Sequence, residues 1–169
     1  DEAALSEDGG ATWGATSGSL PSSSTWDAVA YGAGSWVVTA SGTNKAAYST
    51  DKGATWTEAT LPSTSDWSSV VHGSNRFVAV SSTSGTTAAL SIDGGANWVA
   101  STLPATAAWS HIEYGQGTFL AVSGGTAYAT STDGIVWQSQ THSESNGLVA
   151  TAFGNPNQVG SFAGVRQGT

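Results

Sequence analysis

The sequence predicts an all-β protein folded as a β-propeller, most simply one of four blades with four antiparallel strands each. An octapeptide of the pattern Ser-x-Asp-x-Gly-x-Thr-Trp recurs in residues 6–13, 49–56, 91–98 and, one residue shorter, 131–137. The tryptophans that end these segments lie 43, 42 and 39 residues apart. A repeat of about 40–45 residues has the length of one propeller blade. No segment shows a sustained helical period, and glycine, proline and serine interrupt the chain about every 8–12 residues.

Each repeat contains a pair of strand-like segments joined by a tight turn. The first segment ends at a glycine, and the second is rich in aromatic and β-branched residues, which favour strands. We expect these to be strands a and b of each blade, with strand a lining the central channel. The pairs are residues 26–32 with 35–40, 67–73 with 76–81, and 109–115 with 118–123.

The octapeptide is predicted to be the turn between the two outer strands of a blade. Strand c precedes it in residues 45–49, 87–91 and 127–131, and strand d begins near the tryptophan. Strand d then runs to a Leu-Pro pair, in residues 20–21, 61–62 and 103–104. Because proline lacks a backbone N–H and restricts the residue before it, we expect each proline to mark the exit from strand d.

The repeats divide the chain into units that form a single domain over residues 1–169. Three whole units lie between a first unit that supplies only strands c and d and a last unit that supplies only strands a and b. We expect the last pair to close against the first, with residues 159–163 beside residues 2–6, which removes the open sheet edges. The alternative is a slice of a larger propeller. The units are about 1–20, 21–62, 63–104, 105–142 and 143–169.

Composition excludes several classes of partner and site. The formal net charge is −8, with Lys45, Lys52, Arg76 and Arg166 as the permanent cations, so nucleic acid and anionic lipid are not expected partners. The absence of cysteine excludes disulfides and thiolate metal sites. No run of about 20 apolar residues is present, so we expect no membrane insertion. Because the sequence also lacks methionine, we expect a processed product or part of a longer chain.

The octapeptide resembles the Asp-box, or BNR repeat, known from sialidases, sortilin-like receptors, some glycoside hydrolases and phage tail proteins. The resemblance implies a propeller in which the box is a structural turn: the aspartate accepts backbone N–H groups, glycine permits positive φ, and tryptophan covers the hairpin. We therefore expect no metal and no cofactor, because a Ca²⁺ site needs several converging carboxylates. The residues with this structural role are Asp8, Asp51, Asp93 and Asp133 with Trp13, Trp56, Trp98 and Trp137.

The resemblance does not extend to catalysis. Asp-box sialidases hold the substrate carboxylate with three arginines, whereas this chain has Arg76 and Arg166 only. A glycosidase needs two carboxyl groups facing one another, and outside the boxes only Asp27, Asp66 and Glu113 lie near strand a. No Ser/His/Asp or metal-ligand spacing is present. We therefore predict a protein that is not an enzyme, with no catalytic residues.

A ring of aromatic residues is the best candidate for ligand binding. Trp26, Trp67 and Trp109 stand at the start of strand a, beside polar loops that include Asn44. Aromatic rings beside hydroxyl and amide groups suit sugar recognition, because a ring face stacks on pyranose C–H groups. The alternative is that these tryptophans fill the wedges between blades.

Three functional hypotheses follow. The leading one is a non-catalytic extracellular or virion module for surface attachment or assembly, because the Ser/Thr/Gly-rich, low-charge composition resembles virion and tail proteins of phages. The second is a lectin-like module that binds a cell-surface glycan, and the third is a glycoside hydrolase remnant. A fold alone does not choose among them, since function lies in sites.

Overall fold

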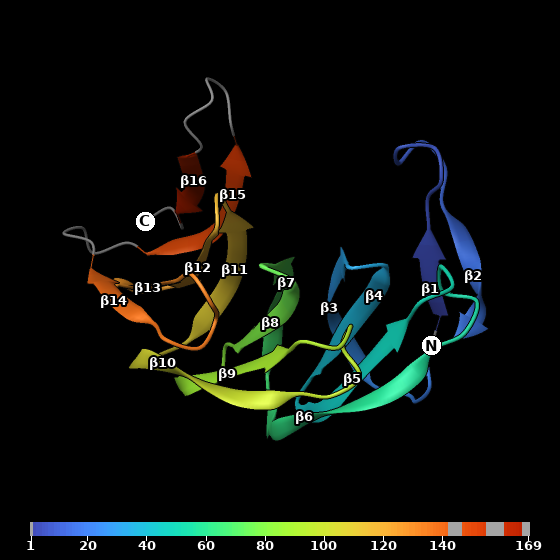
Figure 1. Cartoon of the computed structure of the whole chain (residues 1–169), viewed down its shortest axis with the longest axis horizontal. Coiled ribbons are helices and arrows are strands. Elements are labelled where there is room, and N and C mark those ends of the chain that lie inside the picture. Colours follow the sequence, from blue (N-terminus) through green and yellow to red (C-terminus); the bar gives the residue numbers. More distant parts are fainter. Residues whose placement is uncertain (1, 142–146, 155–160, 167–169) are drawn as a thin grey trace.

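The computed structural model describes residues 2–141, 147–154 and 161–166, and these form the sixteen strands that the repeat predicts (Figure 1). Blade 1 consists of β3 (Thr25–Gly32), β4 (Ser35–Ser41), β5 (Thr43–Ser49) and β6 (Thr57–Ser65). Blade 2 consists of β7 (Trp67–Gly73), β8 (Arg76–Ser81), β9 (Gly85–Ser91) and β10 (Val99–Ala107). Blade 3 consists of β11 (Trp109–Gly115), β12 (Thr118–Ser123), β13 (Ala127–Ser131) and β14 (Gln138–Thr141). The described residues include no helix, hence none that is long and apolar enough to cross a membrane.

Each complete blade is a four-stranded antiparallel sheet in sequence order. The register between the second and third strands is the same in all three blades: Trp36 lies opposite Ser49, Phe77 opposite Ser91, and Phe119 opposite Ser131. The aromatic side chain thus always faces the serine that begins the octapeptide. The repeat therefore specifies pairing as well as length.

Two-residue turns connect the first two strands of each blade. Their central residues are 33–34, 74–75 and 116–117, and all of them have positive φ, as in a type I′ turn. Such turns match the right-handed twist of the flanking strands. The second central residue is Gly34, Asn75 or Gly117, and glycine and asparagine tolerate this conformation best, which favours the hairpins at these positions.

The prediction that proline ends the outer strand is wrong in two of three repeats. β6 and β10 continue past Pro62 and Pro104 to Ser65 and Ala107. The pairing with β5 and β9 shifts register across each proline, as at a β-bulge. An outer edge strand has no further neighbour to pair with, so the missing N–H is tolerated there. Only the strand Gly14–Ser19, β2, ends before its Leu-Pro pair.

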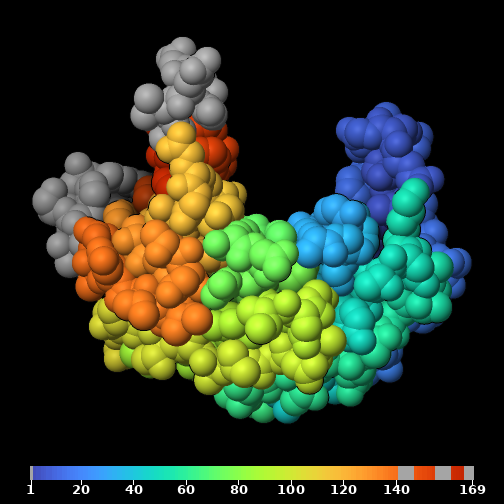
Figure 2. Space-filling view, viewed as in Figure 1, coloured from blue at the N-terminus to red at the C-terminus, as the bar shows by residue number. Residues whose placement is uncertain are grey.

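Two half-blades flank the three complete ones. The N-terminal half-blade consists of β1 (Glu2–Leu5) and β2 (Gly14–Ser19), and the C-terminal half-blade consists of β15 (Leu148–Gly154) and β16 (Ser161–Arg166). They lie at opposite ends of an arc, with a hollow between them (Figures 1 and 2). In the described residues β1 pairs only with β2 and β16 only with β15, so the expected closure within one chain is not confirmed. Residues 159 and 160 lie outside the described part.

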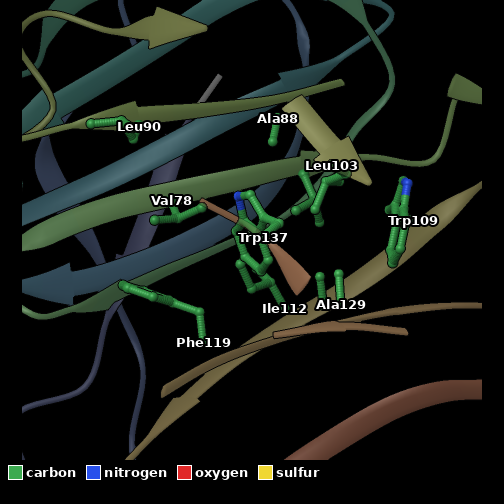
Figure 3. Close-up of a cluster of buried hydrophobic side chains, with 11 residues drawn as sticks. Val78, Ala88, Leu90, Leu103, Trp109, Ile112, Phe119, Ala129 and Trp137 are labelled. Atoms are coloured by element: carbon green, nitrogen blue, oxygen red, sulfur yellow. The ribbon is translucent and has the colours of Figure 1, made fainter. Parts of the chain in front are cut away.

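The hydrophobic core lies mainly between adjacent blades. One cluster joins blades 2 and 3, where Trp137 packs among Val78, Leu103 and Ile112 (Figure 3). A second cluster joins blades 1 and 2 around Trp67. Burial of apolar area between sheets is the dominant stabilising contribution, at roughly 25 cal/mol per Å². Each blade is therefore stabilised by the blade before it in the chain.

Candidate functional site

The octapeptides form turns built around the aspartate. In the first, Asp8 accepts hydrogen bonds from the Ser6 hydroxyl at 2.8 Å and from the backbone N–H of Thr12 at 2.9 Å. Asp51 and Asp93 accept the equivalent bonds. In the shorter fourth box, Asp133 accepts the N–H groups of residues 135 and 136, both at 2.9 Å. Each aspartate thus accepts N–H groups of its own turn.

These hydrogen bonds favour the ionised carboxylates. The hydroxyl and N–H of Thr12, followed by the Ser6 hydroxyl, lower the pKa of Asp8 to about 2. Thr55 and Ser49 lower the pKa of Asp51 to about 2 in the same order. The pKa values of Asp93 and Asp133 are also lowered. Each box aspartate is therefore an internal hydrogen-bond acceptor and a poor proton donor near neutral pH.

The expected tryptophan platform is wrong for two of its three members. Trp67 and Trp109 are fully buried, and their Nε1–H groups donate to main-chain oxygens of the preceding blade, Trp67 to Ser63 O at 3.2 Å and Trp109 to Gly85 O at 3.1 Å. The first position of strand a faces the preceding blade, so a whole blade covers this ring. Trp26, which follows only a half-blade, stays partly exposed, and Asn44 lies exposed on β5.

An aromatic groove lies between the N-terminal half-blade and blade 1. It has a volume of about 350 Å³ and is lined by β1, β2, β3 and β4. Four tryptophans from different parts of the first 56 residues contribute to it, and glutamate, aspartate and lysine side chains add charge. The tryptophans are Trp13, Trp26, Trp36 and Trp56, and the charged residues are Glu2, Asp27 and Lys52.

Sequence reasoning found Trp26 as a candidate binding residue, but it missed the other three tryptophans of the groove. Trp13 and Trp56 belong to boxes, and Trp36 occupies the place of Phe77 and Phe119, so all three look like core residues in the repeat. Trp98 and Trp137 are indeed buried, whereas Trp13 is 68% exposed. The repeat pattern carries no signal that separates Trp13 from Trp98, because the difference lies in whether a neighbouring blade covers the ring.

The three carboxyl groups near strand a have different surroundings. Asp66 accepts the Thr83 hydroxyl at 3.1 Å, and its own backbone N–H donates to the Thr83 oxygen. Glu113 lies 3.8 Å from Nε2 of His111, and Asp27 lines the groove. Within the described ranges, no three His, Asp or Glu side chains gather as a metal-binding group.

The one described arginine side chain has a structural contact. Nη1 of Arg76 donates to the main-chain oxygen of Asp133 at 2.6 Å and so joins blade 2 to the box of blade 3. The side chain of Arg166 lies outside the described part.

Comparison with solved structures decides the fold. The chain is similar to a GH74 enzyme from Niastella koreensis, with 21% identity and a TM-score of 0.72 over 94% of this chain and 24% of that one. It is also similar to YCF48 from Cyanidioschyzon merolae, with 21% identity and a TM-score of 0.61 over 89% of this chain and 52% of that one. These neighbours are propellers of the Asp-box type. The chain has a β-propeller fold.

The comparisons extend no further than this fold. A sialidase from Trypanosoma rangeli matches the propeller with 14% identity and a TM-score of 0.51, over 82% of this chain and 26% of that one. The propeller thus spans about half or less of these three neighbours. No family model and no curated protein matches the chain.

Proposed function

We propose that this propeller is a non-catalytic module for surface attachment or assembly. The aromatic groove carries the proposal, because it is concave, apolar and next to the unpaired edge of β1. Apolar surfaces of this kind are typical of protein contact sites, and an open strand edge can accept a further strand. The box carboxylates support the non-catalytic part, since their hydrogen bonds serve their own turns.

The setting that we propose is outside the cell or on a virus particle. A composition poor in charge and rich in Ser, Thr and Gly supports it, as does the resemblance of the repeats to those of phage virion proteins. The partner is then another virion or fibre protein, or a glycan on a cell surface.

Glycan binding is the second candidate function, and the groove favours it as well. Tryptophan faces stack on the C–H groups of a pyranose, and carboxylates beside them accept hydrogen bonds from sugar hydroxyls. Trp13 and Trp26 with Asp27 supply these groups within one groove. The proposed sugar site is thus this groove, in place of the ring of strand-a tryptophans.

The experiment measures binding of the fluorescently labelled chain to a glycan array and to intact bacterial cells. Trp13→Ala removes an exposed side chain of the groove and should abolish retention with little loss of stability. Val99→Ala is the matched control, because Val99 is also an exposed apolar side chain but lies outside the groove.

Treatment of the cells separates the two candidate functions. Retention that survives periodate oxidation of surface sugars supports attachment to protein, and retention lost after periodate supports the lectin function. Equal retention of wild type and Trp13→Ala would contradict the groove as the site. Turnover of a sialoside or polysaccharide panel by the chain would contradict the non-catalytic part.

A further inference from the structure

Adjacent blades contact one another through an aromatic ring placed on a glycine. The ring of His72 covers Gly32, that of Tyr114 covers Gly73, and that of Phe153 covers Gly115. A Cβ atom at any of these glycines would overlap the ring, so only glycine permits the approach. The ring always belongs to the later strand a, and the glycine ends the earlier one.

Each end of the arc carries one half of such a ring-on-glycine contact. Gly154 ends β15 in the equivalent position, and no described atom lies within 4 Å of the place of its Cβ. Tyr31 is the equivalent ring on β3, and it is 56% exposed. Within the part of the chain that the structure describes, no ring covers this glycine and no glycine lies beneath this tyrosine, so the two ends of the arc are complementary.

The side chains around Tyr31 are also exposed where a preceding blade would cover them. Val29 is 59% exposed on β3, whereas its equivalents Val70 and Ile112 are 7% and 1% exposed. Both of these pack against the preceding blade. The aromatic groove lies where a preceding blade would place its two inner strands.

The octapeptide turns repeat this pattern. Gly95 of one box lies against Val37 of the preceding blade, and Gly134 of the next lies against Val78. Gly10 of the first box has no described atom within 4 Å of the place of its Cβ. In blade 3, Leu120 occupies the position of Val37 and Val78, and it is incompletely buried. This is a second unfilled contact between the same two ends.

The strand edges of the half-blades are complementary too. β1 corresponds to a strand c and β16 to a strand b, and among the described residues neither has the partner strand that its position calls for. The common register of the three whole blades predicts the missing pairing: Phe162 opposite Ser6, Ala163 opposite Leu5, and Val165 opposite Ala3. Unpaired edges of this kind are templates for another strand.

The arrangement of the arc favours a second copy as the occupant. The two half-blades lie at opposite ends with the hollow between them (Figures 1 and 2). To close on itself, the chain would have to bring its two end half-blades together and so change the angles at the ring-on-glycine contacts, where ring and glycine are already in close contact. A copy related by a two-fold axis offers both missing partners at once, and a closed symmetric pair leaves no free edge.

We propose that two copies of this chain close one ring, the β15–β16 half-blade of each occupying the aromatic groove of the other. The proposal rests on the assembly function proposed above and names a second copy as the partner. In the dimer this half-blade takes the place of a glycan in the groove, so the dimer and the lectin function exclude one another at this site. Tyr31 of each copy covers Gly154 of the other, and each β1 pairs with the β16 of the other copy. Two chains then form six whole blades and two shared ones.

Cross-linking tests the pairing in the 169-residue chain, which has no cysteine of its own. Ala3→Cys combined with Val165→Cys places thiols opposite one another in the predicted register. Oxidation should yield a reducible covalent dimer on a denaturing gel. Ala4→Cys with Val165→Cys is the control out of register, and it should yield at least tenfold less dimer. A disulfide within one chain, or no disulfide, would overturn the proposal.

Analytical ultracentrifugation of the wild type and of Gly154→Leu provides the second measurement. The new side chain enters open space in the single chain but blocks the ring of Tyr31, so the dissociation constant of the dimer should rise at least tenfold. Gly124→Leu is the control, since Gly124 also faces open space with an ordinary φ. A monomeric wild type, or equal dissociation constants for Gly154→Leu and wild type, would overturn the proposal. Neither measurement uses a cell or a glycan, so failure here leaves the attachment function to its own test.

Discussion

At the scale of the residue, the box aspartates show how one side chain determines a turn. The carboxylate of Asp93 accepts bonds from the Ser91 hydroxyl and from both the backbone and side-chain N–H groups of Asn97. The Ser91 hydroxyl oxygen, which is buried, in turn accepts the N–H of Gly95. A change at the aspartate therefore disturbs donors along the whole turn.

Replacing Asp93 with alanine should lower the free energy of unfolding by about 1–3 kcal/mol, the range for losing hydrogen bonds to a charged acceptor. Asp93→Asn should lose less, because it keeps one acceptor oxygen. Chemical denaturation measures both, with Ile92→Ala at the neighbouring exposed position as the control. If Asp93→Ala unfolds at the same denaturant concentration as wild type, the box does not stabilise the fold.

His72 is expected to make the protein sensitive to mild acid. It occupies a position that holds Tyr or Phe in the other repeats, its Nε2 is buried without a hydrogen-bond partner, and desolvation lowers its pKa below 6.5. The unfolded chain therefore takes up a proton more readily than the folded one. Stability should fall as pH drops through about 6.5 toward the lower folded pKa.

The change His72→Phe isolates this effect. Phenylalanine restores the type of ring found in Phe153 and has no proton to bind, so the loss of stability just below pH 6.5 should disappear. Thermal unfolding measured from neutral pH to pH 5 checks it. A wild type and a variant with parallel pH profiles in this window would contradict the assignment to His72.

At the scale of the element, the tryptophans of the repeats differ in whether a preceding blade covers them. Trp67 packs against a whole blade, while Trp13, in the box of the N-terminal half-blade, has no blade to pack against. Trp67→Ala should therefore cost roughly 3–5 kcal/mol, as large-to-small changes in cores do. Trp13→Ala should cost little. Denaturant titrations of the two variants measure the difference, and equal losses would contradict the burial.

The strands and the box turns were predictable because their causes are local. Turn residues with positive φ, β-branched runs and the Ser/Asp/Thr pattern all act within one repeat. The prolines were read wrongly, because a bulge in an edge strand depends on whether a further strand pairs with it. Trp13 is exposed and Trp98 is buried for a similar reason: a neighbouring blade covers only Trp98. The repeat alone does not reveal whether such a blade is present.

At the scale of the whole molecule, closure depends on the angle between blades. The sequence shows that strand a of each blade ends in a ring-bearing residue followed by glycine, but the angle at which His72 meets Gly32 arises only from three-dimensional packing. Four repeats are compatible with a small closed ring or with an arc of a larger one. The sequence left both arrangements open, and the structure is an arc.

An arc of repeats should also open from its ends. In repeat proteins each unit is stabilised by its neighbours, so the terminal units are the least stable. Blade 2 has a whole blade on each side, whereas the half-blades have one neighbour and a free edge. In the Gly154→Leu variant, at a concentration where it is monomeric, amide hydrogen exchange should be slowest in β8 and β9 and fastest in β1 and β16.

The wild type at a concentration where it associates provides the contrast. Pairing of β1 with β16 of a second copy satisfies backbone N–H groups that the single chain leaves exposed to water, so exchange there should slow at least tenfold. Exchange in β8 and β9 should change little, because their neighbours are the same in both states. Exchange measured by mass spectrometry at two protein concentrations checks this. Uniform protection along the monomeric variant would contradict the gradient. Exchange in β1 and β16 of the wild type that does not change with protein concentration would contradict the shared blades.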